Sequence, residues 1–160
     1  MTNPTTNPTN IHGTGLVLGA TGVLLRGPSG SGKSTLALAL LDRWDGRGQA
    51  ALLVSDDRVE MTLAGDGLAM HAPSAIAGLI ELRGRGIVSR PHQAASRLHL
   101  VVDLVDDFER MLEEEAMRTD LLGVEIHRAP VPHSRLISLG HQVLLVAEAV
   151  SAVGAAAAHP

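Results

Sequence analysis

The chain has 160 residues, of which 45% are hydrophobic and 19% are charged, a composition typical of a folded protein with one substantial core. Its formal net charge of −4 gives no broad attraction to nucleic acid or to an anionic membrane surface. One tryptophan and one phenylalanine provide no stacking platform for single-stranded nucleic acid, and the absence of cysteine excludes disulfides and thiolate sites. We therefore expect a single domain that binds neither nucleic acid nor membrane.

The first ten residues, MTNPTTNPTN, are polar and rich in threonine, asparagine and proline. This composition predicts a disordered tail over residues 1–10, followed by one domain over residues 11–158. The tail lacks the basic and apolar regions of a signal peptide, and no apolar run is expected to reach membrane-spanning length. These features predict a cytoplasmic protein.

The first half of the domain alternates between apolar strands and one helix. Two short strands, over residues 11–18 and 23–25, are predicted on either side of a glycine-bearing turn. After a glycine-rich segment, residues 35–44 carry helix formers, and residues 45–48 read as a loop. The apolar run at residues 50–54 predicts a buried strand that leads into acidic residues.

The middle of the chain is richer in short strands. Residues 59–63 and 68–71 alternate in polarity around Gly-Asp-Gly, which predicts a hairpin. A charged, glycine-bearing stretch over residues 81–87 follows. Residues 98–105 predict another apolar strand, and residues 107–117 carry helix formers, so that Arg110 is expected on a helix.

The last quarter of the chain predicts a strand at residues 124–131 and an apolar segment at residues 142–158 that ends as a helix. The start of that last segment is compatible with either strand or helix. The order of strand, glycine-rich loop, helix and strand indicates an α/β fold. We expect a single domain of the P-loop kinase type, with a mixed sheet sandwiched by helices.

The segment Gly27–Ser34 fills every fixed position of a Walker A phosphate-binding loop. Its glycines allow backbone N–H groups to point at phosphates, and the helix that follows favours anions at its N-terminus. Lys33 can add charge near the β- and γ-phosphates, and the Ser34 hydroxyl can ligate Mg²⁺. A chance turn rich in glycine and serine is the alternative. The residues predicted to bind the nucleotide are Gly27, Pro28, Ser29, Gly30, Ser31, Gly32, Lys33, Ser34 and Thr35.

Two further groups of charged residues can carry chemistry. Asp56 and Asp57 directly follow a predicted strand, where carboxylates of α/β proteins face the ligand crevice. They can hold Mg²⁺ or accept a proton from an attacking hydroxyl, although a solvated acidic turn has the same pattern. Glu81 precedes Arg83 and Arg85, whose guanidinium groups can pair with phosphate oxygens or can form an ordinary charged surface turn.

Five blocks in this order resemble the C-terminal catalytic domain of the bacterial HPr kinase/phosphorylase family. They are Ile11-His12-Gly13, the Gly27–Ser34 loop, residues 53–59 (LVSDDRV), residues 79–87 (LIELRGRGI) and Phe108-Glu109-Arg110. The combination is far more specific than a Walker A loop alone. The chain resembles a short form that lacks the family's N-terminal domain.

The resemblance implies a nucleotide site and two cofactors, ATP and Mg²⁺. Lys33 would hold the nucleotide phosphates. Ser34 would ligate Mg²⁺, with Glu81 as a second metal-associated carboxylate.

The resemblance also implies an acceptor side and a partner. Asp57 would be the general base that activates a serine hydroxyl of the phosphocarrier protein HPr, and Asp56 would be its neighbour in the active site. His12 and Arg110 match active-site positions, although each taken alone reads as a surface residue. In reverse, phosphate would attack phosphoserine and give pyrophosphate. The family is usually hexameric, so an oligomer is implied.

Two other functions remain open. The chain could be a P-loop kinase for a different acceptor, either a protein or a small molecule. It could also be a non-catalytic protein that binds ATP and regulates a partner. Asp57, Glu81 and Arg110 favour an enzyme, because ATP binding alone does not need a base on the acceptor side.

Overall fold

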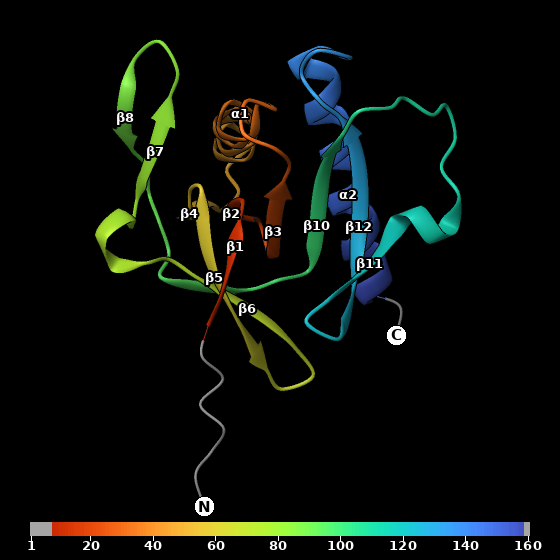
Figure 1. Ribbon diagram of the computed structural model, residues 1–160, viewed down its shortest axis with the longest axis horizontal. Helices are drawn as coiled ribbons and strands as arrows, with labels where there is room; N and C mark the ends of the chain where they lie inside the picture. Colours follow the sequence, from red (N-terminus) through yellow and green to blue (C-terminus); the bar gives the residue numbers. More distant parts are fainter. Residues whose placement is uncertain (1–7, 159–160) are drawn as a thin grey trace, which may run out of the picture.

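The computed structural model describes residues 8–158, so most of the predicted disordered tail lies outside the described residues. Thr9 and Asn10, which the tail was predicted to include, instead belong to the first strand, β1 (Thr9–His12). The fold has three layers, with two helices, a central six-stranded sheet and a smaller four-stranded sheet (Figure 1). The predicted mixed α/β fold is confirmed.

The central sheet is mixed, and most of its strands run in one direction. Its order is β11 (Arg118–Leu121), β12 (Val124–Pro132), β10 (Leu100–Val105), β3 (Thr21–Arg26), β2 (Thr14–Leu18) and β4 (Ala51–Ser55). The pairs β12–β10 and β10–β3 are parallel, whereas β2 is antiparallel to both β3 and β4. The carboxyl ends of β3, β4, β10 and β12 therefore lie at one edge of the sheet, where ligands bind in α/β proteins.

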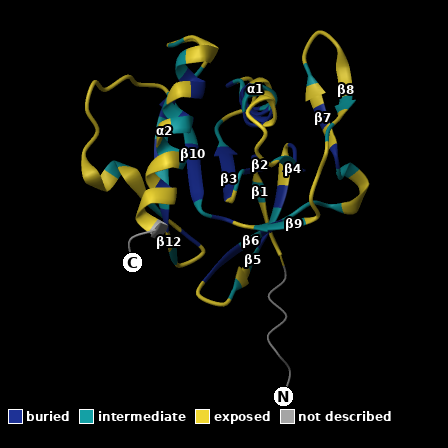
Figure 2. Ribbon diagram, turned by 180° about the vertical axis from the view of Figure 1, so that it is seen from behind, coloured by how far each residue is buried: buried dark blue, intermediate teal, exposed yellow. Residues whose placement is uncertain are grey.

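Both helices cover the same face of this sheet. Helix α1 (Lys33–Gly46) follows the Gly27–Ser34 loop directly, and α2 (Leu139–Ala158) ends the described chain. Leu36 and Leu40 of α1 and Val146 of α2 pack with Leu16 and Leu25 of the sheet in one core. In Figure 2, β3 and β10 are largely buried, whereas both helices carry exposed as well as buried residues.

The opposite face is covered by the four-stranded sheet, and not by helices. Its order is β1, β5 (Arg58–Ala64), β6 (Gly67–His71) and β9 (Ala95–Arg97). Met61 and Met70 of this sheet pack on Leu24 and Val101 of the central sheet in a second core. The predicted hairpin over residues 59–71 is confirmed as β5 and β6.

A separate hairpin, β7 (Leu79–Leu82) and β8 (Gly86–Ser89), stands beside α1 (Figure 1). A 3₁₀ turn, η1 (Ser74–Ile76), leads into it. The charged, glycine-bearing stretch of the sequence is thus a two-stranded hairpin.

The expectation that no apolar run is long enough to span a membrane is wrong for helix α2. Over Leu139–Ala156 its mean hydropathy is 1.4, so by length and composition it could span a membrane, although the sequence was expected to contain no such run. Only 17% of the residues in that window are buried. Val143, Val146 and Val153 nevertheless pack in the core beneath the sheet, which makes α2 a helix of the folded domain.

The predicted first strand, over residues 11–18, is two strands that belong to different sheets. The strand is interrupted at Gly13, where an added Cβ would lie 2.6 Å from the carbonyl oxygen of Leu25. No other residue fits this close approach without moving β3. The break lets β1 leave the central sheet and pair with β5, which places His12 opposite Arg58.

The helix predicted over residues 107–117 is wrong. The segment crosses from β10 to β11 as an extended loop with one 3₁₀ turn, η2 (Glu114–Met117) (Figure 1). A stable surface helix needs an apolar stripe to bury. Here Phe108 and Met111 stay 52% and 87% exposed, so no such burial is available. Smaller differences are the strands β9 and β11, which were not predicted, and α1, which continues to Gly46 through part of the predicted loop.

Three charged side chains join the parallel strands near their carboxyl ends. Asp103 of β10 accepts hydrogen bonds from Arg26 Nε at 2.8 Å and Nη2 at 2.9 Å, and from Arg128 Nε at 2.6 Å. Burial raises the pKa of the Asp103 carboxyl, but the hydrogen bonds and charges of the two arginines outweigh burial and leave the pKa below its ordinary value. Arg26 directly precedes Gly27, so this charge cluster anchors the start of the loop.

Candidate functional site

A cavity of about 630 Å³ opens where the carboxyl end of β4 meets the N-terminus of α1. Four parts of the chain line it. These are His12 on β1, the Gly27–Ser34 loop with the start of α1, the Asp56-Asp57 pair after β4, and the β7–β8 hairpin. The start of α2 and the turn before it close the remaining side.

The Gly27–Ser34 loop curls around the N-terminus of α1. Gly32 has a φ of 95°, in the left-handed region that favours glycine, and the helix begins at the next residue. Leu36 N donates to the carbonyl oxygen of Gly32 at 3.0 Å, which closes the first helical turn. The loop therefore presents the positive end of α1 to the cavity, an arrangement that favours phosphate.

Lys33 folds back over this loop. Its Nζ donates to the carbonyl oxygens of Gly27 at 2.6 Å and Pro28 at 3.0 Å. An ammonium group has three N–H donors, so one remains for a ligand oxygen. Burial lowers the pKa of Lys33 from 10.5, and the charges of Asp57 and Asp56 partly oppose this.

Asp56 is a buried anchor that connects three elements. Its Oδ1 accepts from Thr14 Oγ1 at 2.9 Å and from Ser34 Oγ at 3.0 Å, and its Oδ2 accepts from the backbone N–H of Glu81 at 3.2 Å. These bonds hold the carboxylate beside the hydroxyl of Ser34, in the first turn of α1. The Asp56 carboxylate is therefore close enough to contact a ligand or metal ion that binds to the Ser34 hydroxyl.

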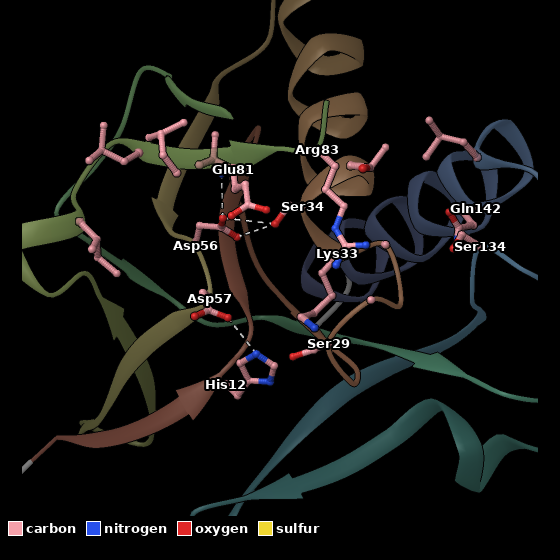
Figure 3. Close-up of a pocket in the computed structure, with 18 residues that line it drawn as sticks. His12, Ser29, Lys33, Ser34, Asp56, Asp57, Glu81, Arg83, Ser134 and Gln142 are labelled. Atoms are coloured by element: carbon pink, nitrogen blue, oxygen red, sulfur yellow. Dashed lines mark hydrogen bonds and ion pairs between the residues drawn. The ribbon is translucent and has the colours of Figure 1, made fainter. Parts of the chain in front are cut away.

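The side chain of Asp57, unlike that of Asp56, is exposed to solvent. Its side chain is 81% exposed and pairs with His12, whose Nε2 lies 2.9 Å from Asp57 Oδ1 (Figure 3). Gly13 N also donates to the Asp57 carbonyl oxygen at 3.1 Å, which holds β1 against this turn. Asp57 has a φ of 67°, a conformation uncommon for a residue other than glycine and typical of functional sites.

Glu81 completes a group of oxygen donors. It lines the cavity, and in Figure 3 its side chain lies beside Asp56 and Ser34. Hydroxyl and carboxylate oxygens are ligands that Mg²⁺ accepts together with phosphate and water. Within residues 8–158 no group of three or more His, Cys, Asp or Glu side chains could hold a metal alone. This donor set therefore fits a Mg²⁺ ion that also binds a ligand's phosphates.

The structure brings most of the predicted site residues together. His12, Ser29, Gly30, Gly32, Lys33, Ser34, Thr35, Asp56, Asp57 and Glu81 all line the cavity. Gly27, Pro28 and Ser31 belong to the loop but are not among the lining residues. Arg110 is exposed on the segment between β10 and η2, and it does not line the cavity either.

Sequence reasoning missed the wall opposite the hairpin. Ser134, Leu139 and Gln142 line the cavity there. An added Cβ at Gly32 would lie 3.2 Å from Ser134 Oγ, so this wall touches the loop. Gln142, a buried polar residue of α2, donates from Nε2 to the Pro132 carbonyl oxygen at 3.0 Å.

Comparison with known families shows which family the chain belongs to. The family described as the HPr Serine kinase C-terminal domain matches residues 4–156 of this chain. The chain belongs to this family. The resemblance inferred from the five sequence blocks is thereby confirmed, and it extends past Arg110 to cover β11, β12 and most of α2.

The relatives that the chain matches are longer proteins. It is 32% identical over 154 residues to the HPr kinase/phosphorylase of Bordetella pertussis, a match that covers 88% of this chain and 46% of that protein. It is 36% identical over 141 residues to the HPr kinase/phosphorylase of Geobacillus thermodenitrificans, covering 78% and 42%. The chain thus spans about half the length of the curated relatives that it matches.

A solved structure of the family has the same fold. The HPr(Ser) kinase/phosphatase from Coxiella burnetii superimposes with a TM-score of 0.68 at 27% sequence identity. The match covers 88% of this chain and 96% of that one. The layers described above are therefore those of an HPr kinase C-terminal domain.

Proposed function

We propose that this domain is an ATP-dependent protein serine kinase that phosphorylates the phosphocarrier protein HPr or a related carrier. One observation carries the proposal. The Gly27–Ser34 loop and the Asp57–His12 pair line the same cavity. A phosphate donor and a group that can accept a hydroxyl proton thus share one chamber, which phosphoryl transfer requires.

The donor side would be formed by the loop and the residues around Ser34. The backbone N–H groups of the loop and the remaining N–H of Lys33 would bind the β- and γ-phosphates of ATP. Ser34, Asp56 and Glu81 would hold Mg²⁺. That ion would offset the phosphate charge when bound.

The acceptor side would be formed by Asp57. In the transfer, the serine oxygen forms a bond to the γ-phosphorus, the bond from that phosphorus to the β–γ bridging oxygen breaks, and ADP leaves with the electron pair. The serine proton passes to the Asp57 carboxylate. Asp57 suits this task because its side chain is exposed, whereas Asp56 is buried and already accepts from Thr14, Ser34 and Glu81.

The test is transfer from labelled ATP in the presence of Mg²⁺ and purified HPr, with free serine as a small-molecule control. Label on HPr and none on free serine is the expected result. ATP binding without transfer to HPr would favour the regulatory alternative, and transfer to a small hydroxyl compound alone would favour a different kinase. Addition of phosphate afterwards tests the reverse reaction, since loss of label as pyrophosphate would reveal phosphorylase activity.

His12 is expected to orient Asp57. In His12→Gln, the Asp57 carboxylate loses the partner at 2.9 Å, and kcat should fall by about 10- to 100-fold because the base is no longer held in place. The free energy of unfolding should change by less than about 1 kcal/mol, because exposed ion pairs contribute little. Steady-state kinetics and urea unfolding measure the two effects. An unchanged kcat would show that the pair has no part in transfer.

Two broader features accompany the proposal. A cytoplasmic location fits an enzyme that uses ATP and a carrier protein, and fractionation of cells that express the chain tests it. Assembly into an oligomer, as the family resemblance implies, is tested by sedimentation of the purified domain.

A further inference from the structure

Gln142 is a polar side chain that is buried almost completely in the wall of the cavity. It is 1% exposed, and it lines the cavity together with Ser134 and Leu139. Its Nε2 donates to the Pro132 carbonyl oxygen at 3.0 Å. Because a carbonyl can only accept, this bond fixes which end of the amide is the nitrogen. The acceptor end, Oε1, is therefore directed away from Pro132.

The Oε1 atom of Gln142 is open to the cavity. Within residues 8–158 the Gln142 amide makes one hydrogen bond, through Nε2, so Oε1 accepts none. In that part of the chain Ser31 Oγ is the one fully buried side-chain nitrogen or oxygen without a partner, so Oε1 is not sealed in the core. The open space that Gln142 lines is the cavity, and Oε1 can accept a hydrogen bond from a ligand there.

The wall that contains Gln142 lies against the phosphate loop. Gln142 N donates to the Ser138 carbonyl oxygen at 3.0 Å, at the start of α2. Ser134 lies beside the loop, since an added Cβ on Gly32 would be 3.2 Å from its Oγ. Leu139 adds a partly exposed apolar side chain to the lining. An apolar surface with one fixed polar atom is the usual lining of a site for a small organic group.

The wall also lies toward the end of the cavity that a nucleoside would occupy. In Figure 3, Ser134 and Gln142 lie on the far side of Lys33 from Asp56 and Asp57. The proposed kinase function brings the γ-phosphoryl group next to Asp57. A nucleotide whose phosphates cross the loop in that direction extends its sugar and base toward Ser134 and Gln142.

We propose that Leu139 and Gln142 bind the adenine base, and that Gln142 Oε1 selects adenine by accepting a hydrogen bond from its exocyclic amino group. This inference rests on the proposed kinase function and adds base selection to it. Hypoxanthine and guanine carry an oxygen where adenine carries the amino group. Two acceptors would then face each other without a hydrogen between them, and the buried amide would lose its partner.

The first test changes the ligand and leaves the protein intact. Calorimetric titration in Mg²⁺ compares ADP with inosine diphosphate, with ADP dimethylated on the amino group, and with deoxy-ADP, which lacks one ribose hydroxyl. We expect the first two analogues to bind at least about tenfold more weakly than ADP, and deoxy-ADP to bind as ADP does. Equal affinity for ADP and inosine diphosphate would overturn the inference. A loss confined to deoxy-ADP would place the ribose at Gln142 and would overturn it as well.

The second test compares Gln142→Met with Gln93→Met. Gln93 also donates from Nε2 to a backbone carbonyl, that of Ala95 at 2.6 Å, but it does not line the cavity. In Gln142→Met the preference for ADP over inosine diphosphate should disappear, whereas Gln93→Met should retain it. Inorganic tripolyphosphate, a probe without a base, should bind both variants and the wild type within about threefold.

The outcomes separate this inference from the kinase proposal. A folded Gln142→Met protein that keeps the preference would overturn base selection and leave the kinase proposal intact. If thermal unfolding shows that this variant is not folded, the ligand series on the wild type decides alone. Wild-type protein that binds neither ADP nor tripolyphosphate would overturn both proposals.

Discussion

Replacing Asp57 with asparagine is expected to lower the rate of phosphoryl transfer by about 10²- to 10⁴-fold, the usual contribution of a positioned general base. The amide cannot accept the serine proton, yet it has nearly the same size as the carboxylate. Asparagine also tolerates the left-handed backbone of this position, where φ is 67°, so the turn should keep its shape. Calorimetric titration should give an ATP affinity close to that of the wild type.

The matched control is Asp66→Asn. Asp66 is also an exposed aspartate in an ion pair, with Arg97 at 2.9 Å, but it lies on the β5–β6 turn and does not line the cavity. It should transfer phosphate at the wild-type rate. Transfer by Asp57→Asn at a rate near that of the wild type would remove Asp57 from the mechanism.

Replacing Asp103 with asparagine is expected to lower the free energy of unfolding by about 3 kcal/mol at neutral pH. The carboxylate is 16% exposed and bridges Arg26 and Arg128, so the variant leaves two half-buried cations without their counter-charge. Urea unfolding at pH 7 measures the loss. The control Glu125→Gln breaks an exposed pair with Arg118 and should change the free energy by less than about 1 kcal/mol.

The effect of Asp103 depends on pH in a defined direction. Its pKa in the folded protein lies below the ordinary 3.8, so the unfolded chain takes up the proton first as pH falls. The stabilisation is complete above the unfolded pKa and is lost as pH falls through the folded one. The stability difference between wild type and Asp103→Asn should therefore shrink below about pH 4. A difference that stays constant down to pH 2 would contradict a charged Asp103 in the fold.

The donor half of the site was predictable because its chemistry is local. A Walker A loop requires glycine at fixed positions, and Gly32 has the left-handed backbone that this requirement implies. The residues at the end of a buried strand reach the ligand edge of the sheet, as Asp56 and Asp57 do. Such features depend on neighbours in sequence, so a single sequence carries them.

The roles within the acceptor half depended on contacts distant in sequence. The pattern of the residues alone does not separate Asp56 from Asp57, and the family resemblance assigned the base to Asp57. The bonds to Thr14 and Ser34 show that Asp56 is the anchor, and the pair with His12 belongs to the exposed Asp57. The wall formed by Ser134 and Gln142 comes from a segment about 100 residues after the loop, as the numbering of the chain shows.

The prediction of a helix at residues 107–117 also failed because it depended on contacts distant in sequence. Helix formers such as Met111, Leu112 and Glu113 set a weak local preference, and tertiary packing decides whether it is realised. The structure offers these residues no surface to bury against, since Met111 is 87% exposed. With the helix absent, Arg110 has no strand or helix to direct it toward the cavity, and it lies on the exposed segment instead.

The most direct test of the proposed chemistry is to identify the atom of HPr that receives the phosphoryl group. HPr incubated with the domain, ATP and Mg²⁺ is digested and mapped by mass spectrometry, with Asp57→Asn protein as the parallel sample. The proposal predicts one phosphoserine that is present with the wild type and strongly reduced with Asp57→Asn. HPr that remains unmodified, or that carries the phosphate on a residue without a hydroxyl, would contradict it.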